Sequence, residues 1–587
     1  MASAKLTKRI AVALIAALTV LAGCGTNSTG SQSGGDSGSG SQSSAQTATP
    51  QPTAAPAASG GKNIPDGPEG KYDPPIHVTS VRGVTPGIEY LPDQTIENNV
   101  WTREFESELG IKLDYEWVVY NDQYNNKINV TMVSGDMPDF FLVNMQQFQT
   151  LAQAGQLADL TDLFEKYASP LVKEIFAENN AIRYKAGTVN GRLLGLAYNG
   201  GSLDDAHLLY IREDWMKKLG RTAPRTIDEL VDLAIAFAKE DPDSNGIDDT
   251  YGLLINKELF GGFASIDGFV NGFGGYAYNP AGGSGTNLIF LKDQNGQAIW
   301  GDVQPEVKQA LGKLAEMFKA GAIHPEFSVM DASRAAEMLT SHKVGMTFGA
   351  FWVPTWPINN MHNENPEVDW DVYEIPTLTG EPGVVQSMGG TPNSFIVVPK
   401  SSEHPEAIIK ILNYSTERIS GSKKDVGKYH TMTVDGKDYG IHMLTPYYVA
   451  TSEKNQNYHY QVLEAFKMGD PSGLDEEGRL YYDQLVAFAE GDRSQWVHHK
   501  LWNEGGVFEK LGRYKREGRI LQSAYTGAPT PTMLSRGTAL RDLQVRTFTE
   551  IIMGSKPLDA FDEFVQQWYD QGGRDILEEV NASGQVQ

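Results

Sequence analysis

The only cysteine of this chain, Cys24, directly follows a short apolar segment near the amino terminus. Three basic residues precede an apolar run over residues 10–20, which has the length of an export signal and is too short to span a bilayer. We expect residues 1–23 to be a lipoprotein signal peptide, because the run ends in residues 21–24 (LAGC), a lipobox whose small residues let a signal peptidase approach the bond before Cys24. The Cys24 thiol would carry the lipid, and two acyl chains give a stable membrane anchor. With that thiol consumed, no disulfide can form, so the fold must be stabilised by a large core, to which a bound metal ion could add.

The segment after Cys24 is too polar to fold. Residues 25–61 consist of Ser, Gly, Gln, Thr, Ala and Pro with few other residues, and they include one charged side chain, Asp36, and no aromatic ring. Such a composition cannot bury a core. We expect residues 24–62 to be the lipidated cysteine and a flexible tether that spans about 35 Å. A glycosylated stalk is the alternative, and it would also act as a tether.

The net charge of the exported part makes two classes of partner unfavourable. Without the leader, 46 Lys and Arg residues stand against 74 Asp and Glu residues, which gives a net charge of −28. This charge argues against binding to nucleic acid and to anionic lipid head groups. It also disfavours a polyanionic ligand weakly, although a few local arginines could override the overall field.

Apolar patterns along the rest of the chain indicate an α/β fold. Trp101, Phe105 and Leu109 recur every four residues, which places them on one face of a helix that ends at Gly110. Strands that alternate with helices of this length predict parallel βαβ units. The expected strands cover residues 76–81, 111–119, 140–143 and 208–211.

An acidic loop follows a helix that opens with a capping box of Thr226 and Glu229. Residues 241–250 place side-chain oxygens at positions one, three, five and nine, a glycine at position six and a backbone carbonyl at position seven. This spacing is that of the front of an EF-hand calcium loop. The expected ligands of a structural calcium ion are Asp241, Asp243, Asn245, Asp249 and the carbonyl of Ile247.

The loop departs from the EF-hand pattern at position twelve, where Gly252 replaces the bidentate glutamate. Bidentate binding by Asp249, or water, could complete the calcium shell. The alternative is an Asx-rich turn that holds no metal. A lone loop, without a second EF-hand, favours a structural ion over a sensor.

Several segments follow one another in a specific order along the exported chain. Beyond the lipobox and the tether, they are residues 211–220 (IREDWMKKLG), 249–252 (DTYG), 321–327 (GAIHPEF), 394–398 (SFIVV), 404–407 (HPEA), 527–533 (GAPTPTM) and 564–568 (FVQQW). Together they resemble the family 1 extracellular solute-binding lipoproteins, and most closely the large Gram-positive members that are similar to alginate- and oligosaccharide-binding proteins. The resemblance covers nearly the whole exported chain, and no single motif except the lipobox is decisive.

The resemblance implies a two-lobed periplasmic-binding-protein type II fold with a ligand cleft between the lobes. Lobe 1 would comprise residues 63–208 plus about 390–450, and lobe 2 residues 209–389 plus about 510–587. A helical insertion at about 451–509 could belong to either lobe. Ligands of α/β sheets bind outside the carboxyl ends of the strands, and ligand sites favour domain interfaces, which agrees with this placement.

The ligand that this resemblance implies is a carbohydrate. Sugar binding requires aromatic rings that stack on pyranose faces and planar polar groups that pair with hydroxyls. The family places a stacking tryptophan where Trp352 lies, after an expected strand. For Trp352 and the nearby Trp356, the alternative is packing under a Pro-rich loop. The candidate contacts are Arg82, Asn144, Gln146, Gln147, Tyr198, Asn199, Phe260, Phe263, Trp352 and Trp356.

The resulting hypothesis is a lipid-anchored solute-binding protein on the extracellular face of the cell membrane. It would capture a carbohydrate, most simply an oligosaccharide, and deliver it to the permease subunits of an ABC importer. We expect a monomer that touches the membrane only through its lipid, binds no nucleic acid and is not an enzyme. The alternatives are a lipid-anchored glycoside hydrolase, which needs two carboxylates across the sugar, and a peptide-binding lipoprotein.

Overall fold

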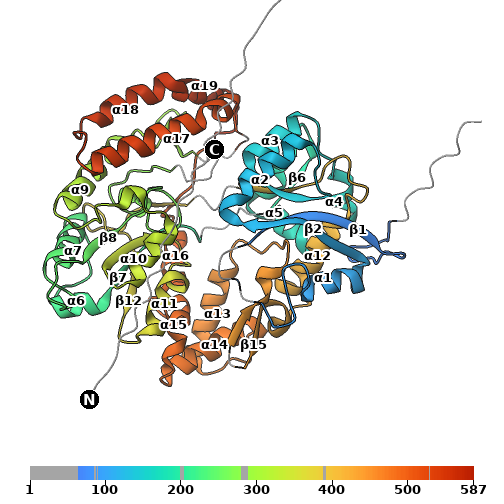
Figure 1. The fold of residues 1–587 in the computed structure, drawn as a ribbon, viewed down its shortest axis with the longest axis horizontal. Helices are drawn as coiled ribbons and strands as arrows, with labels where there is room; N and C mark the ends of the chain where they lie inside the picture. Colours follow the sequence, from blue (N-terminus) through green and yellow to red (C-terminus); the bar gives the residue numbers. More distant parts are fainter. Residues whose placement is uncertain are drawn as a thin grey trace, which may run out of the picture. The chain divides into compact units, whose positions relative to one another are not determined.

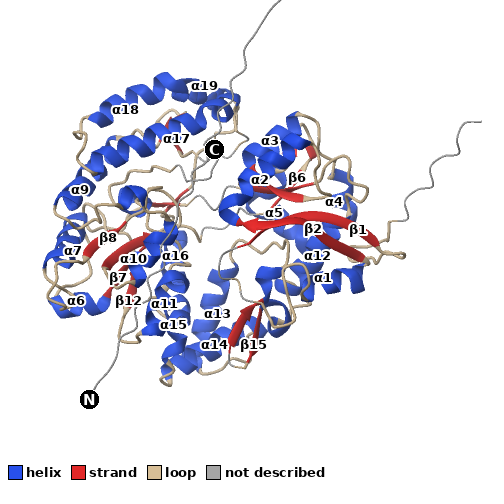
Figure 2. Cartoon of the chain, viewed as in Figure 1, coloured by secondary structure: helices blue, strands red, loops and turns tan. Residues whose placement is uncertain are grey.

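The computed structural model describes residues 64–84, 88, 90–198, 204–278, 288–387, 392–435, 437–525, 527 and 529–586. Cys24 and the expected leader and tether therefore lie outside the described residues. The described chain is built around two β-sheets with separate apolar cores, which we call lobe 1 and lobe 2 (Figure 1). In Figure 2 the strands of each lobe lie among helices.

Lobe 1 is built around a three-stranded sheet whose middle strand comes from far along the chain. β14 (Ser394–Val397) lies between β3 (Phe141–Asn144) and β6 (Gly195–Ala197) and is antiparallel to both. Alternate residues of a strand point to opposite faces. Phe395 and Val397 accordingly pack into one apolar cluster and Ile396 into another.

A parallel pair of strands adjoins this sheet. β1 (Ile76–Val84) pairs in parallel with β2 (Ile111–Tyr120), and the chain between them forms a helix. The Phe140 amide donates to the Thr79 carbonyl at 3.4 Å, which ties β1 to the start of β3. The other elements of lobe 1 are α2 (Asn121–Ser134), α3 (Met145–Gln153), α4 (Thr161–Tyr167), α5 (Pro170–Ala186), β4 (Thr188–Val189), β5 (Arg192–Leu193), α12 (Ala407–Ile419), η4 (Val426–His430), β15 (Thr431–Val434), β16 (Lys437–Gly440) and η5 (Ile441–Leu444).

The helix between β1 and β2 confirms the pattern read from the sequence and adds a detail. It begins as α1 (Val100–Glu104) and continues as η1 (Phe105–Leu109), a π-helical turn that ends at Gly110 in the left-handed conformation, with φ 64°. A π turn is wider than an α turn, so side chains four residues apart stay on one face. The three apolar side chains of the pattern are all fully buried.

Lobe 2 contains a four-stranded sheet in the order β12 (Trp370–Tyr373), β7 (Leu208–Arg212), β11 (Val344–Gly349) and β8 (Tyr251–Leu254). All of β7 and β11 is buried, as expected for strands with a neighbour on each side. The other elements of lobe 2 are α6 (Glu213–Leu219), α7 (Ile227–Lys239), α8 (Asp267–Asn271), β9 (Phe290–Lys292), β10 (Ala298–Trp300), α9 (Pro305–Lys319), η2 (Phe327–Val329), α10 (Ala332–Thr340), η3 (Pro354–Ile358), α11 (Asn359–Glu364), β13 (Val385–Gln386), β17 (Ile520–Leu521), α17 (Pro531–Ile552), α18 (Ala560–Trp568), η7 (Tyr569–Gly573) and α19 (Arg574–Ala582).

The α7 helix shows the capping box that the sequence predicts. The Thr226 hydroxyl accepts the Glu229 amide at 3.2 Å, and the Glu229 carboxylate accepts the Thr226 amide at 3.1 Å. The carboxyl half of α7 lies so close to β8 that only glycine fits opposite it. A Cβ on Gly252 would lie 2.2 Å from the Ala234 carbonyl oxygen.

Helices follow one another between residues 454 and 516. They are α13 (Lys454–Met468), α14 (Glu476–Ala489), η6 (Arg493–Gln495), α15 (Trp496–Trp502) and α16 (Val507–Arg516), drawn in orange and red-orange in Figure 1. Their buried apolar residues, such as Val462, Leu485 and Phe508, belong to the same cluster as the lobe 2 sheet. The segment thus shares the lobe 2 core.

The expectation of parallel βαβ units is only partly correct. β1–β2 and β8–β11 are parallel, whereas β7 is antiparallel to both β11 and β12. The sequence pattern predicts that strands alternate with helices, but it does not predict which strands pair with each other. β14, for example, comes from a later segment and is antiparallel to both of its neighbours in the lobe 1 sheet.

Among the described residues, no helix has both the length and the apolar content that crossing a membrane would require.

Candidate functional site

A pocket of about 430 Å³ in lobe 1 contains two of the residues predicted to contact ligand, Arg82 and Tyr198. We call it the tyrosine pocket. Arg82 comes from the end of β1, and Tyr198 follows β6. The remaining walls come from β3, from the start of α2 and from residues 442–448. The lining residues are Val81, Arg82, Gly83, Ile88, Asn121, Tyr124, Leu142, Tyr198, His442, Met443, Thr445, Pro446, Tyr447 and Tyr448.

Arg82 joins strand β1 to residues 442–448. Its Nη1 donates to the Pro446 carbonyl at 2.7 Å and its Nη2 to the Met443 carbonyl at 2.9 Å. Arg183 supports the same region from α5, since it donates to the carbonyls of Tyr198 and Ala450 at 3.3 and 3.2 Å. Two arginines therefore hold the wall that carries the pocket tyrosines.

The pocket tyrosines are neutral hydrogen-bonding groups attached to apolar rings. Burial raises the pKa of Tyr198 and of Tyr447 above the ordinary tyrosine value, and the nearby Arg82 offsets only part of this. Their rings meet edge to face with centroids 5.7 Å apart. Burial also raises the pKa of Tyr124, whose hydroxyl donates to the Leu142 carbonyl at 3.1 Å. Protonated phenols of this kind can both donate to and accept from a ligand hydroxyl.

Three more predicted contacts form an aromatic cluster in lobe 2. The Trp352 ring lies 6.3 Å from Phe263 and 6.1 Å from Trp356, measured between centroids. Phe263 is buried, Trp352 is half-buried and Trp356 is 41% exposed. Gly262 permits the packing, because a Cβ there would lie 2.8 Å from the Trp352 ring. The exposed ring of Trp356 thus lies beside Trp352 and over the buried ring of Phe263.

The other predicted contacts lie elsewhere. Asn144 and Gln147 form the capping box of α3, in which each side chain accepts the backbone amide of the other residue at 2.9 to 3.0 Å. Gln147 also donates to Asn129 at 2.9 Å. Phe260 is buried and packs near Phe548 with centroids 6.3 Å apart. Gln146, in the first turn of α3, is half-buried, and Asn199 lies outside the described residues.

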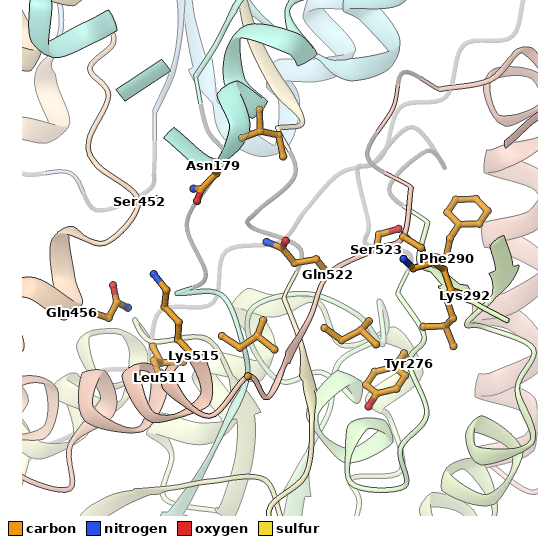
Figure 3. Close-up of a pocket in the computed structure, with 16 residues that line it drawn as sticks. Asn179, Tyr276, Phe290, Lys292, Ser452, Gln456, Leu511, Lys515, Gln522 and Ser523 are labelled. Atoms are coloured by element: carbon orange, nitrogen blue, oxygen red, sulfur yellow. Dashed lines mark hydrogen bonds between the residues drawn. The ribbon is translucent and has the colours of Figure 1, made fainter. Parts of the chain in front are cut away.

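A larger pocket, of about 760 Å³, lies where both lobes and the helices of residues 454–516 contribute residues. We call it the inter-lobe pocket. Figure 3 shows Asn179, Gln456, Lys515 and Gln522 extending toward its interior. Asn179 comes from α5 of lobe 1, Gln456 and Lys515 from α13 and α16, and Gln522 follows β17. Amides and an amine around an open volume suit a polyhydroxylated ligand.

The acidic loop of residues 241–249 brings together the side chains predicted to bind calcium. The Asp241 carboxylate accepts the amides of Asn245 and Gly246, both at 3.1 Å, and the Asn245 amide group donates to Asp243 at 2.8 Å and to Asp249 at 3.2 Å. Partial burial and the neighbouring Asp241 raise the pKa of Asp243. The loop thus brings three carboxylates around the amide groups of Asn245.

Two features of this loop differ from the expected calcium shell. Lys343 donates to the Asp249 carboxylate at 2.8 Å and, with Asn245, lowers its pKa. Gly252 lies in the tight contact with Ala234, so position twelve has no room for a ligand side chain. Among the described residues, no group of three or more His, Cys, Asp or Glu side chains is arranged to hold a metal ion.

Sequence reasoning missed most of the two pockets. Tyr447 and Tyr448 form a conspicuous aromatic pair after Pro446, which could have marked them as a ligand surface. The inter-lobe residues Asn179 and Gln522 lie more than 300 positions apart, and no local pattern connects them.

Comparison with known proteins shows what this chain is similar to. Residues 90–418 match the family model described as bacterial extracellular solute-binding protein. The chain is 24% identical over 498 residues to lipoprotein LipO of Bacillus subtilis, a match that covers 84% of this chain and 89% of LipO. It is 23% identical over 486 residues to the polygalacturonan/rhamnogalacturonan-binding protein YtcQ of the same organism, which covers 81% and 86% of the two chains.

The fold also matches a solved structure. An EF-hand mutant of the Streptococcus pneumoniae ABC-transporter substrate-binding protein FusA, in complex with fructo-nystose, aligns with a TM-score of 0.60 at 16% identity. The alignment covers 86% of this chain and 98% of FusA. The described chain therefore has the two-lobed fold of that protein class, as the sequence predicts.

Proposed function

The chain belongs to the bacterial extracellular solute-binding proteins, and on that premise we propose that it captures a carbohydrate outside the cytoplasm and delivers it to the permease subunits of an ABC importer. The tyrosine pocket is the observation that carries the choice of ligand. It combines aromatic faces, neutral phenol hydroxyls and a guanidinium group at the ends of β1 and β6. Rings supply apolar contact to a pyranose, and the polar groups fix the orientation of its hydroxyls.

The names of the relatives support the same class of ligand, since YtcQ is named for binding polygalacturonan and FusA is a fructooligosaccharide transporter protein. The size of the inter-lobe pocket favours an oligosaccharide over a monosaccharide, since about 760 Å³ is in the range of sites for drug-sized molecules. The exposed tryptophan surface of the lobe 2 cluster offers a second stacking platform. Anchoring through a lipid on Cys24 would keep the protein beside its permease.

We expect at least one oligosaccharide from a broad panel to raise the melting temperature of the purified protein. A ligand that binds only the folded state stabilises it by about 2.7 kcal/mol at a hundredfold excess over Kd, which should appear as a rise of several degrees. Differential scanning fluorimetry measures the shift, and chromatography of the incubated sugars tests for turnover.

Oligosaccharide cleavage by the purified protein would favour the glycoside hydrolase alternative. Stabilisation by oligopeptides and by no sugar would favour the peptide-binding alternative. Either result would contradict the proposed function.

We propose further that the loop of residues 241–249 holds a structural calcium ion. Asp241, Asp243, Asn245, Asp249 and the Ile247 carbonyl would hold it, and the ion would neutralise the clustered carboxylates. The convergence of these side chains on one another supports the proposal. Calcium takes six to eight oxygen ligands, so water would have to complete the shell where Gly252 cannot.

A chelator is expected to lower the melting temperature of the protein, and added calcium to restore it, because binding to the folded state stabilises by mass action. Asp241→Ser should abolish the response. Asp248→Asn provides the matched control, because Asp248 is exposed in the same loop and its ion-pair partner among the described residues is Lys239, at 3.8 Å. An unchanged melting temperature with chelator, together with no calcium in elemental analysis, would rule out the site.

A further inference from the structure

The tyrosine pocket has a local charge opposite to that of the chain. Acidic residues exceed basic residues by 25 over the whole sequence. The described residues that line this pocket nevertheless include Arg82 and no Asp or Glu. His442 also lines it, and burial lowers the pKa of that imidazole, so it is neutral near pH 7. The lining therefore carries one positive charge and no compensating carboxylate.

The hydrogen bonds of Arg82 leave that charge without a carboxylate. A guanidinium has five N–H groups. Two of the Arg82 groups donate to the neutral carbonyls of Pro446 and Met443, and its buried Nε lacks a partner among the described residues. A half-buried cation that meets only neutral acceptors is under-compensated, and a carboxylate is its strongest available partner because charge-assisted bonds are about twice as strong as neutral ones.

The inter-lobe pocket has the same sign of charge. Its described lining includes Lys292 and Lys515 and again no Asp or Glu, although Lys515 forms an ion pair with Glu453 just outside the lining. The described linings of both pockets thus contain basic side chains and no carboxylate, which suits a ligand that bears negative charge.

We propose that the carbohydrate is acidic: an oligosaccharide of uronic acids, one of whose carboxylates pairs with Arg82 while the rings of Tyr198 and Tyr447 contact the sugar. This inference rests on the proposed function and narrows its ligand class. Burial raises the pKa of both tyrosine hydroxyls, so they stay protonated beside that carboxylate. Arg82 acts both as the anchor for this group and as a brace for residues 442–448.

The test measures binding of uronate oligomers to the full chain, purified in mild detergent, by isothermal titration calorimetry. Oligomers of galacturonate, glucuronate and mannuronate are each compared with their carboxyl-reduced, neutral counterparts. We expect at least one acidic oligomer to bind about 30-fold more tightly than its neutral counterpart, or about 2 kcal/mol. The preference should shrink between 50 and 500 mM salt, because salt screens the charge attraction.

Variants of Arg82 distinguish its role in binding the ligand carboxylate from its role in holding residues 442–448 in place. Arg82→Gln should reduce the preference for the acidic oligomer over its neutral counterpart to within threefold. Arg82→Lys keeps the positive charge but loses the planar guanidinium group, and it should keep part of this preference. Arg192→Gln is the matched control, since Arg192 is exposed in β5, and it should keep the full preference. Melting temperatures confirm that each variant folds.

Two results would overturn the acidic ligand alone: neutral oligomers that bind as tightly as acidic ones, or an Arg82→Gln variant that weakens both kinds of oligomer equally. Failure of every acidic and neutral oligosaccharide to bind would instead overturn the proposed function together with this inference.

Discussion

Replacement of Trp352 by alanine is expected to weaken carbohydrate binding by about 30-fold or more, because loss of a buried aromatic anchor costs about 2 kcal/mol or more of affinity. Trp352 is half-buried on a base of Phe263 and Gly262, beside the exposed ring of Trp356. Such a base holds the indole in one orientation before the ligand arrives. Little conformational entropy would then be lost when a sugar stacks on it. Titration calorimetry with the best sugar from the panel measures the change.

Packing and stacking can be separated with a second variant. Trp352→Phe keeps an aromatic face on the same base and should lose less than tenfold in affinity, whereas the alanine variant loses the face altogether. The melting temperature without ligand reports how much of the effect comes from the lobe 2 core. If Trp352→Ala folds and binds within threefold of the parent, Trp352 is a packing residue and not a ligand contact.

Replacement of Gly252 by alanine is expected to destabilise the fold by more than about 3 kcal/mol, at the upper end of what overpacking costs. The added Cβ would lie 2.2 Å from the Ala234 carbonyl oxygen and 2.5 Å from the Ala234 Cα. Both are backbone atoms of a capped helix, so no rotamer change can relieve the contact. The strand β8 and the helix α7 would have to separate. Denaturant unfolding measures the loss directly.

Gly473→Ala is the matched control for Gly252. A Cβ at Gly473 would have no heavy atom within 4 Å, so this variant should stay within about 0.5 kcal/mol of the parent. A Gly252→Ala variant with parental stability would mean that α7 and β8 are not in this close contact.

Local elements of the fold could be predicted from the sequence because local physics determines them. The Thr226–Glu229 capping box needs only two side chains three residues apart, and it forms as expected. The spacing of Trp101, Phe105 and Leu109 likewise identified a helix and its buried face. The π-helical turn within that helix was not predicted, since the same spacing fits both helix types.

The candidate contacts could be predicted only in part. Arg82 was predicted because it follows the expected strand over residues 76–81, and both Arg82 and the predicted contact Tyr198 line the tyrosine pocket. Polar residues after a strand can instead cap the next helix, as Asn144 does, and the sequence does not distinguish the two roles without knowledge of the fold. The opposite wall, at Pro446 and Met443, lies more than 360 residues from Arg82, and no periodic signal links segments so far apart.

The position of β14 in lobe 1 has a consequence for how the chain is made. β3 and β6 have no shared neighbour until Ser394–Val397 has been synthesised, about 200 residues after β6. At roughly 5–20 residues per second, the amino-terminal part of the chain waits about 10–40 s for its central strand. During that interval the sheet of lobe 1 lacks its central strand, so this part of the chain cannot complete its fold. The proposed function requires export. If the chain crosses the membrane unfolded, this delay would give it time to do so without a separate element to hold folding back.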